Sequence, residues 1–208
     1  MIDPNNHIIS KSLFAGAAVS IGCYISLLCD ISLLSPLLLS IGFLFCIVYQ
    51  CNLFTDKAGF ISDTRDIRRL ILVLLLNVFA AFVFGIAIRF LDTSVSIEVD
   101  KILSVKLNTD YLQYIIGSII TGSLMSFAIE STNKQSKNFL IPILCVVGFA
   151  YTGCPHSIVD SFYYGASTLL YSSADSLILH LLVAIIFNFV GCNLYNLTVK
   201  RSLIYHSE

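Results

Sequence analysis

Residues 138–160 read NFLIPILCVVGFAYTGCPHSIVD, an apolar stretch that glycine, proline and histidine interrupt near its end. Apart from the closing aspartate it carries no charge, and it is long enough for a membrane helix, which needs about 20 residues. Backbone that leaves the helix at membrane depth is tolerated only inside protein or beside water. The break at residues 153–156 therefore predicts a helix that is interrupted inside the protein, next to a solute site.

Five further uncharged stretches of similar length predict that the whole chain is a membrane protein. They are Ser12–Cys29, Ile31–Thr55, Leu70–Ile88, Tyr111–Ile129 and Ser176–Val199. The composition agrees, because 57% of the 208 residues are hydrophobic and 12% are charged, whereas a soluble domain carries about 25% charged residues. The net charge of −1 provides no basic surface, so we expect no nucleic-acid partner.

We expect one all-α transmembrane domain over residues 1–208, with six spans. The expected spans lie at about 11–29, 34–54, 68–91, 111–131, 138–165 and 174–199. Three spans in each half is an odd number, so the second half must enter the membrane from the opposite side, as in an inverted repeat. In the first half the second span ends in the polar segment 52–59 (NLFTDKAG), at the place that matches the later break. The second and fifth helices are therefore predicted to be broken.

The basic residues fall mainly on one side of these spans, which predicts the orientation. With a cytoplasmic N-terminus, nine of the twelve Lys and Arg lie in cytoplasmic segments: Lys11, Lys57, Arg65, Arg68, Arg69, Lys134, Lys137, Lys200 and Arg201. The opposite side holds only Arg89, Lys101 and Lys106. We therefore expect a multi-pass protein of the inner cell membrane, embedded in the lipid bilayer, with both termini in the cytoplasm.

The sequence carries little that would support an enzyme. The seven cysteines have neither CxxC nor metal-type spacing, so we expect no metal site and no cofactor. We find no nucleophile motif and no paired carboxylates, and the longest expected loop, about residues 92–110, is too short for a soluble module. An enzymatic function is therefore not expected.

His156 and Asp160 are the residues of the break with the most chemical potential, and they lie one helical turn apart. An aspartate at the centre of a membrane helix costs about 2.5–3.5 kcal/mol on insertion scales, which favours a functional role for it. Pro155 suits the first turn of a new half-helix, whose N–H groups would favour an anion. A buried histidine with a purely structural role is the alternative that these residues leave open.

In their order and spacing, these motifs resemble those of the formate/nitrite transporter family. The resemblance covers about residues 11–200 and rests on Leu53-Phe54-Thr55, Gly153-x-x-His156-Ser157-Ile158, Ala15-Gly16, Asn77 and Asn188-Phe-Val-Gly191. It implies an aquaporin-like protomer, assembled as a homopentamer with one pore in each protomer. It also implies conduction of small monovalent anions of weak acids, such as formate, nitrite, hydrosulfide or short monocarboxylates.

The resemblance assigns pore roles to particular residues. It implies that His156 is the central histidine, that Thr55 hydrogen-bonds near it, and that Lys106 is a vestibule lysine on the outer side. It places two apolar constrictions at Leu39, Phe43, Leu53 and Phe149. A proton is the expected second partner, because an anion that is protonated or hydrogen-bonded at the histidine crosses apolar rings at a lower free-energy cost.

Three departures from the family pattern bear on the substrate. Pro155 replaces a glutamate, Asp160 replaces an asparagine, and Asp56-Lys57 replaces small or neutral polar residues. We expect Asp160 to pair with Lys57 of the facing loop or to be protonated, because a free carboxylate would repel anions; an ionised Asp160 beside His156 is the third possibility. The two carboxylates also leave open a passive channel for a neutral or cationic solute such as ammonia, ammonium or urea.

Overall fold

The computed structural model describes residues 7–59, 64–133 and 138–195, and within these ranges the chain is helical, with no strand. Its helices are α1 (Ile8–Leu27), α2 (Leu34–Val48), α3 (Phe54–Ala58), α4 (Thr64–Leu91), α5 (Thr93–Leu107), α6 (Tyr111–Asn133), α7 (Leu140–Tyr151), α8 (Ser157–Ala166), the 3-10 turn η1 (Leu169–Tyr171) and α9 (Ala174–Tyr195). The expectation of an all-α fold built from apolar helices is confirmed.

Four helices, α1, α4, α6 and α9, are long and apolar enough to cross a membrane. Helices α2 and α7 are apolar but shorter, with 15 and 12 residues. Each of them is followed by a non-helical segment and then by a shorter helix, α3 or α8. Because length and composition identify four spans, the count of six spans stays a prediction.

The outward faces of the long helices are apolar, as contact with lipid requires. On α4, Leu75 and Phe79 are each 61% exposed, and on α9 Ile178 and Leu182 are also exposed. Soluble monomers rarely expose large contiguous apolar patches. The exposed faces therefore agree with a location in a membrane.

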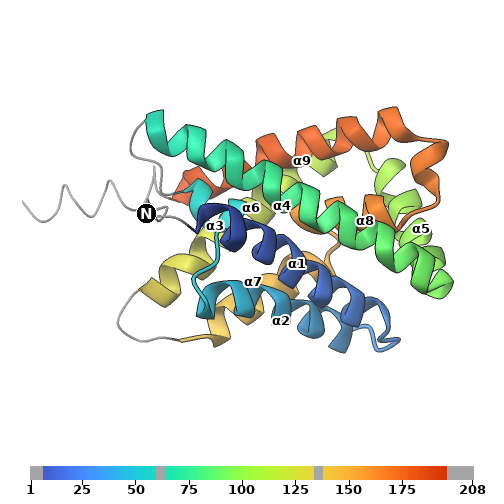
Figure 1. Ribbon diagram of the computed structural model, residues 1–208, viewed down its shortest axis with the longest axis horizontal. Helices are drawn as coiled ribbons and strands as arrows, with labels where there is room; N and C mark the ends of the chain where they lie inside the picture. The colour runs from blue at the N-terminus through green and yellow to red at the C-terminus, as the bar shows by residue number, and fades with distance from the viewer. Residues whose placement is uncertain (1–6, 60–63, 134–137, 196–208) are drawn as a thin grey trace, which may run out of the picture.

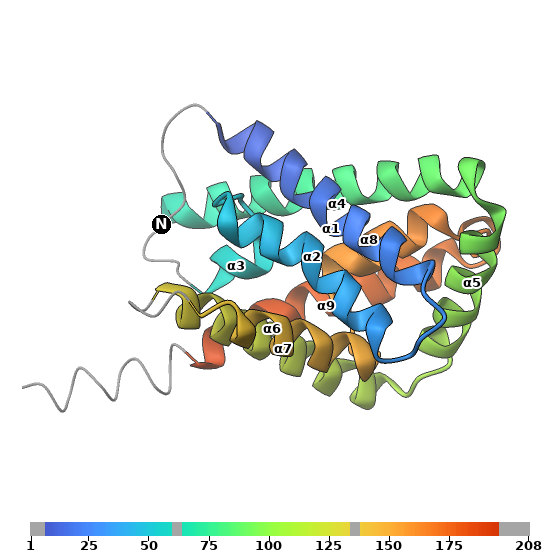
Figure 2. The same ribbon diagram turned by 90° about the horizontal axis from the view of Figure 1, so that it is seen from below.

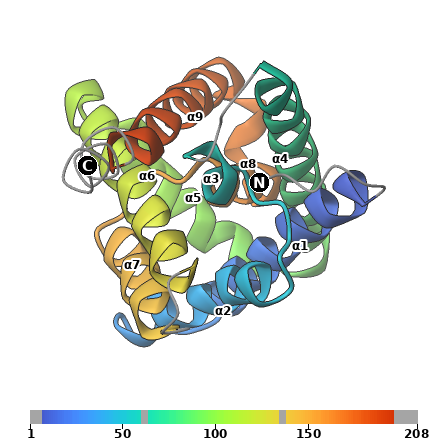
Figure 3. The ribbon, with the colours of Figure 1, turned by 90° about the vertical axis from the view of Figure 1, so that its left-hand side faces the viewer.

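The two short helices lie in the interior of the bundle. Seen from one end, α3 lies at the centre, and α1, α2, α7, α6, α9 and α4 surround it (Figure 3). Helix α8 lies inside against α4, while α5 crosses the end of the bundle farthest from the start of α1 (Figures 1 and 2). This arrangement brings the segments that precede α3 and α8 together inside the protein.

Helix α8 packs unusually close to α4 because both helices have glycine at the crossing. A Cβ on Gly165 would lie 2.1 Å from the carbonyl oxygen of Phe82, and a Cβ on Gly85 would lie 2.2 Å from that of Phe162. Any side chain larger than hydrogen would force the backbones apart at these two positions. The crossing therefore fixes α8, and with it the residues at its N-terminus.

The expectation of a loop at residues 92–110 is wrong, because most of this segment forms α5. Asp92 caps the helix: its carboxylate accepts the N–H and the hydroxyl of Ser94, and these bonds hold the pKa of Asp92 below its ordinary value. Asp100 of α5 accepts a hydrogen bond from Ser167, just after α8. A search for uncharged stretches misses α5, because this amphipathic helix carries four charged residues.

Several residues on which the predicted orientation rests lie outside the part of the chain that the structure describes. The last expected span runs to residue 199, whereas the described part of α9 ends at Tyr195. Four of the basic residues that set the orientation also lie outside: Lys134, Lys137, Lys200 and Arg201. The cytoplasmic placement of both termini therefore stays a prediction.

Candidate functional site

His156, the residue that precedes α8, lies fully buried between two aromatic rings. The ring of Phe149 stacks on the imidazole at a centroid distance of 5.2 Å, and Phe43 meets it edge-on at 5.1 Å. The imidazole Nε2 lies 3.3 Å from the hydroxyl oxygen of Thr55 on α3. Four residues that the sequence analysis assigned to the pore therefore meet at one point, although they come from α2, α3, α7 and the start of α8.

The surroundings of His156 determine which ring nitrogen carries the proton. Its Nδ1 accepts the backbone N–H groups of Ile158 and Val159, at 3.3 and 3.4 Å. A nitrogen that accepts hydrogen bonds is unprotonated in the neutral imidazole, so the proton lies on Nε2, the nitrogen near Thr55. His156 therefore presents an N–H donor to this point of the interior.

The first four backbone N–H groups of α8 all have hydrogen-bond partners. The Ser157 N–H bonds to Asn188, those of Ile158 and Val159 bond to the ring of His156, and that of Asp160 bonds to the His156 carbonyl. We had expected these N–H groups to face an anion directly. That expectation is wrong, because His156 caps its own helix and its Nδ1 accepts two of these N–H groups.

Two cavities lie at different levels along α2, on either side of the level of Phe43, and His156 is not among the lining residues of either. One, here called the α5-side cavity, has a volume of about 300 Å³, and Leu39, Lys106 and Phe149 are among its lining residues. The other, the α3-side cavity, has a volume of about 530 Å³, and Cys46 and Asp56 help to line it. Helix α2 contributes Leu39 to the first cavity and Cys46 to the second, while Phe43, between them along the helix, contacts His156.

The four predicted constriction residues are all buried. Leu39, Phe43, Leu53 and Phe149 are each at most 2% exposed. Leu39 and Phe149 line the α5-side cavity, and Phe43 and Phe149 also lie 5.7 Å apart at the ring centroids. The arrangement places apolar side chains between the two cavities; their role as constrictions stays a proposal.

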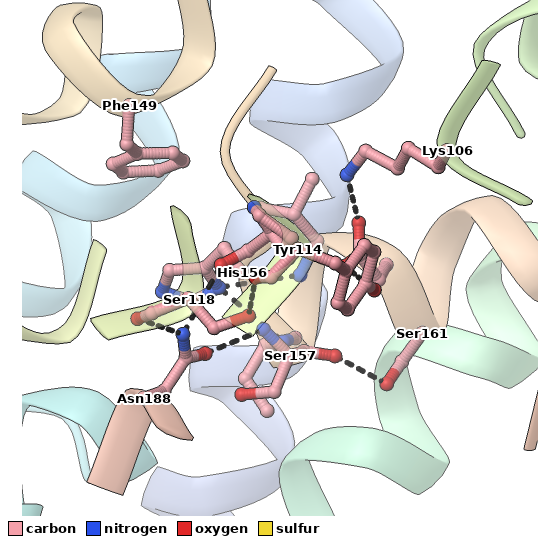
Figure 4. Close-up of polar contacts among 12 residues, drawn as sticks. Lys106, Tyr114, Ser118, Phe149, His156, Ser157, Ser161 and Asn188 are labelled. Atoms are coloured by element: carbon pink, nitrogen blue, oxygen red, sulfur yellow. Dashed lines mark hydrogen bonds and ion pairs between the residues drawn. The ribbon is translucent and has the colours of Figure 1, made fainter. Parts of the chain in front are cut away.

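Asn188 of α9 holds the break between α7 and α8 in place. Its Oδ1 accepts the Ser157 N–H at 2.9 Å, and its Nδ2 donates to the carbonyls of Pro155 at 3.1 Å and Ser118 at 2.9 Å (Figure 4). All three groups are buried, where an unpaired polar atom is costly. One amide side chain therefore satisfies the backbone that the break leaves free.

Asn77 of α4 does the same for the segment before α3. Its Oδ1 accepts the Phe54 N–H at 2.8 Å, and its Nδ2 donates to the carbonyls of Ser12 at 2.7 Å and Asn52 at 3.0 Å. Each asparagine thus bonds to the first residue of a short helix, to the carbonyl two residues earlier, and to a carbonyl of a long helix. This correspondence between the halves supports the predicted inverted repeat.

The ion pair of Asp160 differs from the one we expected. On α8, Asp160 is fully buried, and one carboxylate oxygen pairs with the ammonium of Lys106 from α5 (Figure 4). The other oxygen accepts a hydrogen bond from the Tyr114 hydroxyl at 3.4 Å. The expected partner, Lys57, lies on α3 and lines the α3-side cavity instead. Pairing with Lys57 is therefore wrong, and the reason is that α5, taken for a loop, crosses the bundle beside α8.

Asp56 is the second buried carboxylate. It lies on α3, is 5% exposed and lines the α3-side cavity together with Lys57. Its Oδ1 has no hydrogen-bond partner among the residues that the structure describes. It therefore places a polar atom near the cavity wall.

The site thus consists of a buried N–H donor among aromatic rings, inside a bundle whose outward faces are apolar. The formate/nitrite transporter family model matches residues 3–201, and the chain belongs to this family. The family consists of channels and transporters rather than enzymes. No curated protein sequence matches the chain.

Solved structures share the fold. One similar structure is described as a "Pentameric formate channel with formate bound"; the TM-score is 0.80 at 16% identity, over 95% of this chain and 96% of that chain. Another, an "FNT family ion channel", gives a TM-score of 0.76 at 18% identity, over 90% of this chain and 86% of that chain. At these identities the likeness establishes the fold.

Proposed function

We propose that the chain is a membrane channel or transporter for small monovalent anions of weak acids, such as formate, nitrite, hydrosulfide or short monocarboxylates. One observation carries the proposal: the Nε2 of His156 lies buried beside Thr55, between Phe43 and Phe149, and α2 lines one cavity before Phe43 and another after it. A donor at this depth can bind a small acceptor that has left water. The aromatic rings exclude larger or fully hydrated solutes.

The free energy of transfer favours passage as the neutral acid. Burying a bare charge costs several kcal/mol even after relaxation, and an uncharged acid with a hydrogen bond costs much less. Protonating His156 at Nδ1 would displace the N–H groups of Ile158 and Val159. This geometry therefore favours a neutral imidazole that donates through Nε2–H, with the solute taking up its proton before it reaches the ring.

The proposal is tested with purified protein in liposomes. Formate, nitrite, hydrosulfide, acetate and lactate are offered between about pH 5 and pH 8, and protein-free liposomes supply the background. We expect protein-dependent uptake of the smaller weak acids that increases as the pH falls. If none of the weak acids enters faster than into protein-free liposomes, the proposal is wrong.

Replacing Phe43 with alanine is expected to relax the size limit. The substitution removes the ring that meets His156 edge-on, so lactate uptake should increase relative to formate uptake by about tenfold, the effect of about 1.4 kcal/mol. The matched control is Phe45→Ala on the same helix, whose ring is 41% exposed. A lactate-to-formate ratio that is equal in both variants and the wild type would argue against a constriction at Phe43.

A second candidate function, a passive channel for a neutral or cationic solute such as ammonia, ammonium or urea, is favoured by the two buried carboxylates. Asp56 lines the α3-side cavity, and Asp160 lies one turn from His156. The same liposomes distinguish the two functions. Uptake of ammonium or urea that follows solute concentration alone, without uptake of weak acids, would support this second function.

We also propose a homopentamer in the inner cell membrane, with a proton as the second transported species. The pentameric formate channel, which shares the fold, supports this assembly. The mass of the detergent-solubilised protein, corrected for bound detergent, measures the number of subunits. A monomeric mass in an active preparation would contradict the pentamer.

A further inference from the structure

The α5-side cavity contains one ionic feature, the pair between Lys106 and Asp160. Lys106 is the only charged residue among the described residues that line the cavity. Its side chain is 12% exposed, and the side chain of Asp160 is 0% exposed. The ammonium that the cavity presents is therefore already bound to a carboxylate from inside the protein.

The residues around Lys106 and Asp160 stabilise their ion pair. The Tyr114 hydroxyl donates to the second oxygen of Asp160, and the ring of Tyr163 lies 5.5 Å from the Lys106 ammonium. The other titratable groups near the pair are neutral in their usual state near pH 7: Cys23 of α1, Tyr114 of α6, and Tyr163, Tyr164 and His156 around α8. Separating the ions would leave a buried charge without a partner, which is strongly unfavourable.

We propose that Asp160 is a specificity-determining residue: by cancelling the charge of Lys106, it makes the α5-side cavity accept the neutral form of a small weak acid in preference to its anion. The inference rests on the proposed function and names the form of the substrate that enters. An anion near the pair is attracted by the ammonium and repelled by the carboxylate, so the two contributions largely cancel. The neutral acid feels little of either, and it can donate to or accept from the polar atoms of the cavity.

The test measures the KM for formate uptake as a function of pH in liposomes. In the wild type, the KM for total formate is expected to increase about tenfold for each pH unit above the pKa of formic acid, because only the neutral acid enters. Asp160→Asn keeps the shape of the side chain and frees the ammonium of Lys106. It is expected to lower the KM for formate near pH 7 about tenfold and to flatten the pH dependence, with a smaller change in the maximal rate.

Three further variants separate charge from structure. Adding Lys106→Met to Asp160→Asn removes the freed ammonium, so the gain in anion affinity should reverse. Asp160→Glu keeps the charge and should retain the steep pH dependence. Glu98→Gln breaks an exposed ion pair with Lys101 on the same helix and is expected to leave the KM unchanged.

Different results would contradict the proposed function and the role of Asp160. Absence of weak-acid uptake by the wild type would overturn the proposed function. The role of Asp160 would be overturned by wild-type uptake whose KM does not vary with pH. It would also be overturned by an Asp160→Asn protein whose KM for formate near pH 7 is no lower than that of the wild type. If Asp160→Asn does not assemble, the pH dependence of the wild type and of Asp160→Glu still decides the matter: a KM independent of pH in either of them contradicts the proposal.

Discussion

Replacing His156 with alanine is expected to lower formate uptake about tenfold. The substitution removes the Nε2–H donor at the point where the solute is farthest from water, and a hydrogen bond between uncharged partners contributes about 0.5–1.5 kcal/mol. A loss of about 1.4 kcal/mol corresponds to a factor of ten. Initial rates in liposomes measure the effect, after the assembled protein has been quantified in each preparation.

His156→Gln is the informative partner of this variant. Its amide can place an N–H donor near the position of Nε2, but it does not titrate. Because the Nδ1 of His156 is occupied by two backbone N–H groups, we expect donation rather than ring protonation to matter. The glutamine variant should therefore recover part of the rate and keep the wild-type pH dependence. A glutamine variant as inactive as the alanine variant would show that a donor alone is insufficient.

Replacing Asn188 with leucine is expected to prevent stable assembly. Leucine matches the size of asparagine but leaves the Ser157 N–H and the Pro155 carbonyl without partners, and it removes the bond to the Ser118 carbonyl of α6. Each buried polar group that loses its partner costs about 1–3 kcal/mol, and the total is a large fraction of the stability of an ordinary protein. Thermal unfolding of the detergent-solubilised protein measures the loss.

Two other asparagines provide comparisons for this variant. Asn77→Leu breaks the equivalent contacts in the first half and is expected to destabilise the protein to a similar extent. Asn108→Ala removes an exposed amide at the end of α5 and should have little effect. If Asn188→Leu unfolds at the same temperature as Asn108→Ala, the bonds of Asn188 do not hold the break.

The sequence was sufficient to predict the helical membrane fold and the position of the histidine. Glycine and proline before His156 cannot continue a helix through an otherwise apolar stretch, so the break at 153–156 could be located from local chemistry. The contact between His156 and Thr55 could not be derived in this way, because the two residues are 101 positions apart. It was reached only through the resemblance to the family.

Two of the wrong expectations, the loop at residues 92–110 and the pairing of Asp160 with Lys57, have a common cause. A search for uncharged stretches cannot recognise α5, whose charged residues lie on an amphipathic helix. With residues 92–110 expected to be a loop, nothing placed Lys106 beside Asp160, and Lys57 of the facing loop was the expected partner. The capping of α8 by His156 was missed for a different reason, because a side chain that turns back onto its own helix leaves no trace in residue spacing.

The contacts of the two asparagines were also missed, although a signal was present. Asn77 and Asn188 each lie in a long apolar stretch, where an amide needs hydrogen-bond partners. That cost indicates a structural task for each of them. It does not identify the task, since the partners lie on helices whose packing the sequence does not reveal.

The most direct test of the central claim follows formate and protons together. Liposomes that contain the wild-type protein and a luminal pH indicator are given labelled formate while the membrane potential is recorded. If the acid passes His156 in its neutral form, each formate brings a proton, so the lumen acidifies and no potential develops. Entry of formate that charges the membrane and leaves the luminal pH unchanged would contradict the account.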